Sequence, residues 1–117
     1  LRLYHNHNVR VLFQDLQSIT IKHAVGLAGE AGSLARWVKN CFEGACPTKS
    51  LSIKISEQPD GFCMKWVFNG SSKFLMELNH ELCVGRIRAN FGQGPVDYPL
   101  HLKKVSSQLI LAEALFF

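Results

Sequence analysis

The stretch from Leu51 to Phe91, LSIKISEQPDGFCMKWVFNGSSKFLMELNHELCVGRIRANF, has the most regular pattern in the chain. Apolar and polar residues alternate along four runs of it, which is the spacing of strands with one face buried and one exposed. Residues typical of turns separate three of these runs, at Gln58-Pro59-Asp60-Gly61 and at Asn69-Gly70. The sequence therefore predicts a four-stranded antiparallel meander over about residues 51–91.

Within the meander, the second run has apolar residues on both faces and is predicted to be a central strand. One face carries Phe62, Met64, Trp66 and Phe68, and the other carries Cys63, Lys65 and Val67. In the last run, Leu82 to Phe91, the alternation changes phase at Gly85, which predicts a β-bulge there. The glycines and proline of 92–95 are expected to end the sheet.

The flanking segments are expected to supply one more strand and two covering helices. Alternation over Val9–Leu16 predicts an N-terminal strand, and the β-branched run Ile19–Ile21 either pairs with it or begins a connection. Helical spacing predicts a helix over about 33–43, because Gly26, Gly29 and Gly32 weaken any earlier start. A second helical pattern covers about 100–116. The expected fold class is α+β, with two layers and the helices on one face of the sheet.

Length and composition indicate one folded domain, residues 1–117. The chain has 117 residues, 47% of them hydrophobic and 19% charged, with a net charge of +4. This composition argues against disorder, and the mild basic excess is compatible with nucleic acid or an anionic surface. Four cysteines in a chain with so much apolar sequence do not suggest a disulfide framework, and no signal peptide or membrane-length apolar run is present. We therefore expect an intracellular protein, cytoplasmic or nuclear.

Both termini suggest a domain excised from a larger protein. The chain begins at Leu1 without an initiator methionine, and it ends on the apolar residues Leu115, Phe116 and Phe117. An exposed apolar end of this kind often marks a surface for another domain or subunit. These three residues are therefore candidates for partner binding.

Metal and phosphate sites are each suggested by incomplete patterns. The residues Cys41, Cys46, His80 and Cys83 would form a zinc site if the two pairs met in space, but their spacing is looser than that of usual zinc motifs. Buried free cysteines explain them equally well. The glycine series at 26, 29 and 32 matches neither the dinucleotide fingerprint nor the P-loop, so close helix packing or a loose turn is favoured there. No cofactor or metal is expected.

The segment GLAGEAGSLARWVKN, residues 26–40, resembles the first metal-binding helix of the all-α nucleoside triphosphate pyrophosphohydrolases. The resemblance implies an enzyme in which Glu30 binds magnesium, although Ser33 occupies the position of the family's second acid. The later acidic pair of the family matches only Glu57 and Asp60. The resemblance covers about fifteen residues, and the predicted strands downstream do not belong to an all-α fold.

Basic residues give a further candidate surface. Arg86 and Arg88 share one face of the last strand, where Lys65 or Lys73 would extend a cationic stripe and Lys103 and Lys104 would add to it. Nucleic-acid readers on sheets add stacking aromatics, but Trp66 and Phe68 fall on the face predicted to be the core.

The sequence contains no complete catalytic motif, both termini suggest an excised domain, and the C-terminal residues are apolar. Our first hypothesis is therefore a noncatalytic protein–protein interaction module within a larger intracellular assembly. The alternatives are a nucleic-acid-binding domain that uses the basic face, and a nucleotide pyrophosphohydrolase-like enzyme.

Overall fold

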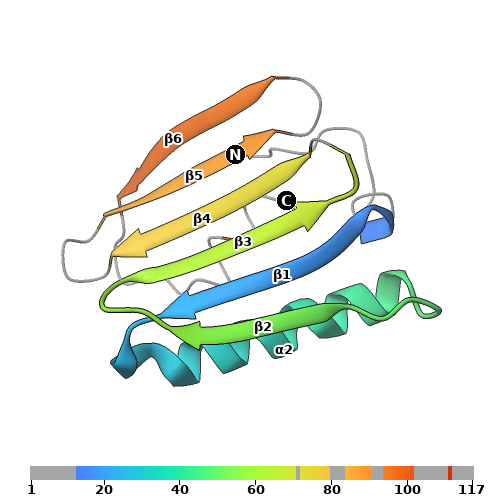
Figure 1. Cartoon of the computed structure of the whole chain (residues 1–117), viewed down its shortest axis with the longest axis horizontal. Helices are drawn as coiled ribbons and strands as arrows, with labels where there is room; N and C mark the ends of the chain where they lie inside the picture. The colour runs from blue at the N-terminus through green and yellow to red at the C-terminus, as the bar shows by residue number, and fades with distance from the viewer. Residues whose placement is uncertain (1–12, 71, 80–83, 91–93, 102–110, 112–117) are drawn as a thin grey trace.

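The computed structural model describes residues 13–70, 72–79, 84–90, 94–101 and 111. The elements whose bounds are fully described are one α-helix, one 3₁₀ turn and the six strands of one sheet (Figure 1). In chain order the elements are β1 (Leu16–His23), η1 (Val25–Leu27), α2 (Ala28–Ala45), β2 (Ser52–Glu57), β3 (Phe62–Phe68), β4 (Lys73–Asn79), β5 (Val84–Asn90) and β6 (Pro95–His101). The chain is thus a mixed α+β domain, as the sequence predicts.

The strand order in the sheet is β2-β1-β3-β4-β5-β6. β2 is parallel to β1, with Ile53 opposite Ile19, whereas every other neighbouring pair is antiparallel. Parallel neighbours need a crossover connection, and α2 supplies it between β1 and β2. The antiparallel meander therefore consists of β3 to β6, one strand later in the chain than the sequence predicts.

The predicted hairpin between β2 and β3 is wrong, because β1 lies between these two strands. The residues of the bend form hydrogen bonds to the end of β1. The amide of Gln58 donates to the carbonyl of His23, and the amide of Ala24 donates to the carbonyl of Gly61, both at 2.9 Å. Gly61 has φ +72°, a conformation that glycine adopts without steric cost. The bend thus carries the chain across the end of β1.

The sheet also continues past the glycines at which the sequence predicts its end. β6 includes Pro95 and Pro99, and it occupies an edge of the sheet, where a strand tolerates proline because one row of its backbone groups is unpaired. The predicted helix over about 100–116 is therefore wrong at residues 100 and 101, which belong to β6. Residues 102–110 and 112–117 lie outside the described residues. Leu111 is helical and fully buried in the core.

The first strand and the bulge also differ from the sequence prediction. β1 begins at Leu16, within three residues of the β-branched run Ile19–Ile21, and residues 13 and 14 are helical. Residues 9–12 of the predicted strand lie outside the described residues. The register of β4 and β5 runs without a shift past Gly85, which lies opposite Leu78, so no bulge occurs there. The register shift lies instead in β1, between Leu16 and Ser18.

The helix α2 is longer than predicted and includes Gly29 and Gly32. Its buried residues recur at helical spacing and pack against the sheet: Ala31, Leu34, Val38 and Phe42. Most helix stability in proteins comes from packing of such an apolar face, and this packing outweighs the weak propensity of the glycines.

The core lies on the side of the sheet that α2 covers at β1 and β2. α2 contacts β1 and β2 and lies behind the sheet in Figure 1. Trp66 is fully buried at the centre, with ring centroids 5.9 Å from Phe13 and 5.7 Å from Phe74. The core side of the strands carries Ile19, Ile21, Phe62, Met64, Trp66, Phe68, Phe74, Met76, Leu78, Ile87 and Ala89. The opposite side of the sheet is not covered by any element that the structure describes, and we call it the open face.

Candidate partner-binding face

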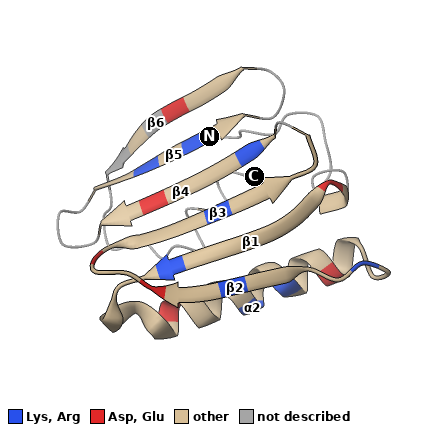
Figure 2. Cartoon of the chain, viewed as in Figure 1, with Lys and Arg blue, Asp and Glu red and all other residues tan. Residues whose placement is uncertain are grey.

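The open face carries a concentration of cationic side chains. Register and alternation place on it, from β1 to β5, Lys22, Lys54, Lys65, Lys73, Arg86 and Arg88. Among the described strand residues, the acidic side chains on the same face are Glu77 of β4 and Asp97 of β6. Figure 2 shows these charges distributed over the strands of the sheet. All eight side chains are exposed, so the described part of the face has an excess of positive charge.

The strand register arranges these cations in rows across the sheet. In one row, Lys54, Thr20, Lys65, Leu75 and Arg88 occupy successive strands. Neighbouring strands are about 4.8 Å apart, so cations two strands apart have backbones separated by about 10 Å. Lys54, Lys65 and Arg88 therefore recur along the row at about this spacing, with an uncharged residue between each pair.

Half-buried apolar residues lie between the cations. Leu75 separates Lys65 from Arg88 in its row, and Val67 lies opposite Lys73 in the next row. Protein interfaces commonly combine an apolar centre with a polar rim, and arginine is more frequent in interfaces than on the rest of the surface. The open face has this combination, and the described aromatic residues of β3 and β4 all point to the core side.

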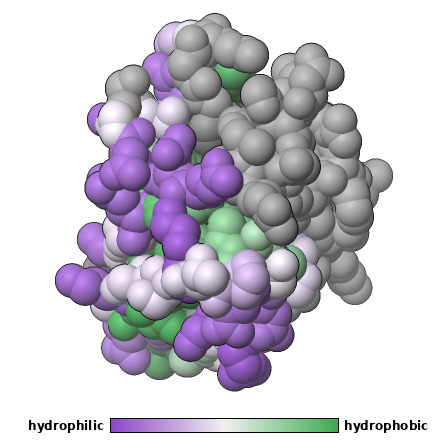
Figure 3. All heavy atoms as spheres, turned by 90° about the vertical axis from the view of Figure 1, so that its right-hand side faces the viewer, coloured by the Kyte–Doolittle hydropathy of each residue, from purple (hydrophilic) through white to green (hydrophobic). Residues whose placement is uncertain are grey.

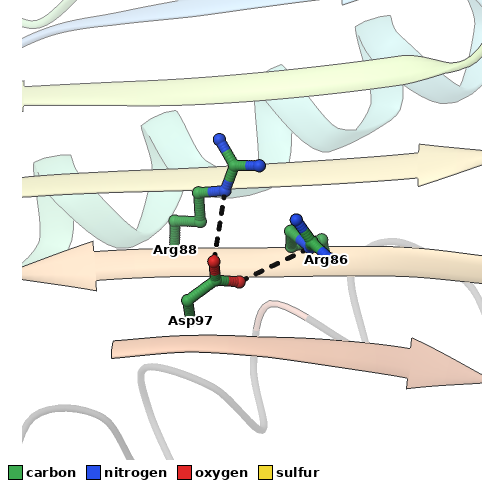
Figure 4. Close-up of polar contacts among 3 residues, drawn as sticks. All are labelled: Arg86, Arg88 and Asp97. Atoms are coloured by element: carbon green, nitrogen blue, oxygen red, sulfur yellow. Dashed lines mark ion pairs between the residues drawn. The ribbon is translucent and has the colours of Figure 1, made fainter. Parts of the chain in front are cut away.

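Arg86 and Arg88 share one carboxylate. The Nε atoms of Arg86 and Arg88 lie 3.4 and 3.7 Å from the two oxygens of Asp97 (Figure 4). Each side chain of this group is about half exposed. Two guanidinium groups thus face one carboxylate, which leaves an excess of positive charge and several N–H donors for a partner.

A shallow depression of about 610 Å³ lies at the end of the open face where β2 ends and β3 begins. Its lining includes Lys22, Cys63, Glu77, Arg86 and Arg88. Burial raises the pKa of the Cys63 thiol and Glu77 raises it further, while Lys22 and Lys65 lower it. The net direction is upward, so Cys63 lacks the thiolate character that a nucleophilic cysteine needs.

The alternation of the sequence correctly places Arg86 and Arg88 on one face with Lys65 and Lys73. Lys22 and Lys54 were missed, because their position depends on the pairing of β1 with both β2 and β3. Trp66 and Phe68 lie in the core, as predicted. The candidate residues Lys103, Lys104, Leu115, Phe116 and Phe117 lie outside the described residues.

The suggested metal ligands are only partly described. Cys46 is buried at the end of α2, and Cys41 is half-buried on the helix, where burial raises the pKa of its thiol. His80 and Cys83 lie outside the described residues. Across the part of the chain that the structure describes, no group of three His, Cys, Asp or Glu residues is arranged to hold a metal ion.

The acids suggested by the hydrolase resemblance lie on three different elements. Glu30 is on α2, Glu57 is the last residue of β2, and Asp60 is in the bend that follows. The six-stranded sheet around them differs from the all-α fold of that enzyme family.

His23 was not singled out by the sequence. It is 5% exposed, on the core side of β1, and its Nδ1 donates a hydrogen bond of 2.8 Å to the carbonyl oxygen of Ala24. The alternation of β1 places it in phase with Ile19 and Ile21, which is the signal that predicts its burial. His23 therefore faces the core and not the Cys63 side of the sheet.

Among the described residues, the structure contains no helix with the length and apolar character needed to cross a membrane. Comparison with known proteins found no matching family model, no matching curated protein and no matching solved structure.

Proposed function

We propose that this domain is a noncatalytic protein–protein interaction module whose open face binds an acidic segment of a partner protein. The observation that carries the proposal is the arrangement of Lys65, Leu75 and Arg88 in one row, with cations on both sides of a half-buried apolar residue. Such a surface is complementary to an extended segment whose contacting face, formed by every second residue, carries acidic and apolar side chains in turn.

The ion pairs of Arg86 and Arg88 with Asp97 are weak, so a partner carboxylate can take the place of Asp97. Exposed ion pairs contribute only about 0–1 kcal/mol, because water and salt screen them. Arg86 and Arg88 can therefore leave Asp97 for a partner carboxylate at small cost. Arginine also binds carboxylates through two parallel hydrogen bonds, which adds geometric specificity.

Nucleic acid is the competing ligand for a basic face. Single-stranded nucleic acid is usually held by aromatic side chains that stack on the bases. The described aromatics of β3 and β4 all pack in the core, so the open-face positions of these strands carry none. This arrangement supports a protein partner over single-stranded nucleic acid.

The test uses fluorescence anisotropy with two labelled probes. One is a peptide that repeats Asp-Ser-Val-Ser, in which aspartate and valine take turns on one face of the extended chain, and the other is a single-stranded oligonucleotide. The Lys65→Glu/Arg88→Glu double variant should bind the peptide at least about tenfold more weakly than the unmodified chain. The matched control is Arg36→Glu/Lys39→Glu, which makes the same charge change at exposed positions of α2 and should keep the affinity.

The salt dependence tests whether charge attraction drives the binding of the peptide. Peptide binding should weaken between about 0.05 and 0.5 M salt, because screening reduces the charge attraction. Equal loss of binding in both double variants would contradict the proposal, as would tighter binding of the oligonucleotide than of the peptide at the same salt concentration.

A further inference from the structure

The outer edge of β2 combines unpaired strand geometry with exposed apolar surface. β2 is at one end of the sheet, and no other described strand pairs with its outer side. An edge strand presents backbone N–H and C=O groups that another strand can pair with. Ile53 and Ile55 point to the core side, opposite Ile19 and Ile21, and Ile55 is 46% exposed. The edge therefore offers both hydrogen-bonding groups and apolar contact.

The sequence around this edge is self-complementary. The segment Lys49–Glu57 reads KSLSIKISE. If it pairs antiparallel with the same segment of a second copy about Ile53, then Leu51 lies opposite Ile55. Lys49 precedes β2, which begins at Ser52, and its amide donates to the carbonyl of Cys46. Extension of the same register through residues 49–51 places Lys49 opposite Glu57, so the charged ends of the two segments attract each other.

Neighbouring registers lack this match. Two copies related by a two-fold axis perpendicular to the sheet keep their core faces on the same side, so facing residues must share the same parity. Pairing about Lys54 places that lysine opposite its own copy, which is a repulsive contact. Pairing about Ile55 places Ile53 opposite Glu57. Only the register about Ile53, among these three, pairs apolar with apolar and opposite charges with each other.

A groove lies where the second copy would place its exposed isoleucine. It has a volume of about 360 Å³ and is formed by the end of α2 and the segment leading into β2, with Phe42, Lys39 and Leu51 in its lining. In the register about Ile53, Ile55 of the second copy lies opposite Leu51 and therefore beside this groove. Apolar surface is visible among hydrophilic side chains at the lower end of Figure 3, the end at which α2 and β2 lie in Figure 1.

We propose that two copies of this chain associate through β2, antiparallel about a two-fold axis at Ile53, to form one continuous sheet. Lys49 can pair with Glu57 of the second copy although its Nζ already donates to the carbonyl oxygen of Gln14, because an ammonium group has three donors. The cationic open faces of the two copies lie on the same side of this joined sheet, so the dimer presents two partner-binding faces together.

Sedimentation equilibrium of the whole chain over a range of concentrations tests this dimer. The unmodified chain should show a monomer–dimer equilibrium, and Ile55→Asp should raise the dissociation constant at least about tenfold by placing a charge in the apolar contact. Val96→Asp is the matched control. Val96 is 41% exposed on the core side of β6 at the opposite edge, and this substitution should leave the dimer intact.

Charge exchange at Lys49 and Glu57 tests the register and does not depend on the behaviour of the Ile55→Asp variant. Each dimer contains the pair twice, so Lys49→Glu or Glu57→Lys alone should raise the dissociation constant about tenfold. The double variant Lys49→Glu/Glu57→Lys should restore the dimer, because opposite charges again face each other.

Cross-linking gives a second reading of the register. Ile53→Cys should form a disulfide between two copies under mild oxidation, because residue 53 faces itself, whereas Lys54→Cys should not. A chain that remains monomeric at all concentrations would overturn the proposal. So would a dimer that Val96→Asp disrupts, or one in which the charge exchange fails to restore association.

Discussion

Asp97 limits the charge of the open face, because its carboxylate lies within 3.7 Å of the Nε atoms of both Arg86 and Arg88. Its position opposite Arg88 in the register of β5 and β6 brings it beside both side chains. A partner carboxylate that binds these arginines must compete with Asp97. The residue therefore acts as an internal competitor for the proposed ligand.

Replacement of Asp97 by asparagine should strengthen binding of the acidic peptide. The substitution removes one negative charge and releases both guanidinium groups, so the dissociation constant should fall about threefold to tenfold at low salt. Anisotropy titration of the labelled peptide measures this change. Asp15→Asn removes the same charge at an exposed position before β1, outside the depression that the arginines line, and serves as the control. A weaker affinity in Asp97→Asn would contradict the role assigned to the arginines.

Cys63 reports on the electrostatics of the same face. Burial and then Glu77 raise the pKa of its thiol, whereas Lys22 and Lys65 lower it. Glu77→Gln removes a negative charge that disfavours the thiolate, so the pKa should fall and alkylation by iodoacetamide should be faster at a fixed pH near 8. Lys65→Gln should act in the opposite direction.

Mass spectrometry of the peptide that contains Cys63 gives the alkylation rate. In the unmodified chain this rate should increase with pH and should still be rising above the ordinary thiol pKa, because the folded-state pKa is raised. An equal rate in both variants would show that the charges of the open face do not act on Cys63.

At the scale of elements, local sequence determines some boundaries and leaves the pairing open. Phe62–Phe68 was predicted as a strand with the bounds that β3 has, because its alternation is regular and turns flank it on both sides. The partner of β2 could not be predicted, because the bend at 58–61 has the same sequence whether the chain returns beside β2 or passes to the far side of β1. That choice depends on contacts between β1 and β2, more than thirty residues apart.

α2 shows the opposite case, in which packing overrides a local signal. The glycines before Ser33 favour a later start, yet the helix begins at Ala28 because Ala31 and Leu34 are buried against the sheet. The sequence did not predict β6 as a strand for a related reason. Its prolines are compatible with a strand only at the edge of a sheet. The edge position is a property of the whole sheet and has no local signature.

A glycine in α2 offers a gain in stability. A Cβ added at Gly32 would have Arg36 Nη1 as its nearest neighbour, at 3.8 Å, which is an ordinary contact. Gly32→Ala should therefore raise the free energy of unfolding by about 0.5–1 kcal/mol, measured by urea denaturation, because alanine favours the helix.

Gly61 provides the contrast for this prediction. It has φ +72°, and an added Cβ would lie 3.0 Å from the carbonyl oxygen of Leu78. Gly61→Ala should lower the free energy of unfolding by about 1–3 kcal/mol. Destabilisation by Gly32→Ala would show that α2 does not tolerate a side chain there and would contradict the described packing.

At the scale of the whole molecule, the helix and the core occupy one side of the sheet and the cations occupy the other. Alternation alone separates these two sides for β3, β4 and β5, so four of the six cations could be predicted from sequence, namely Lys65, Lys73, Arg86 and Arg88. Lys22 and Lys54 enter the same face only through the pairing of β1 with both β2 and β3. Which cations lie on the open face therefore depends on the order of the strands in the sheet as well as on the alternation within each strand.

In the proposed function the partner contacts the open face and does not contact α2. The amide chemical shifts of the ¹⁵N-labelled chain during titration with the Asp-Ser-Val-Ser repeat peptide measure this contact. The largest shift changes are expected at open-face residues of the central strands, including Lys65, Leu75 and Arg88, with little change along 28–45. Changes confined to α2, or spread evenly over both sides of the sheet, would contradict it.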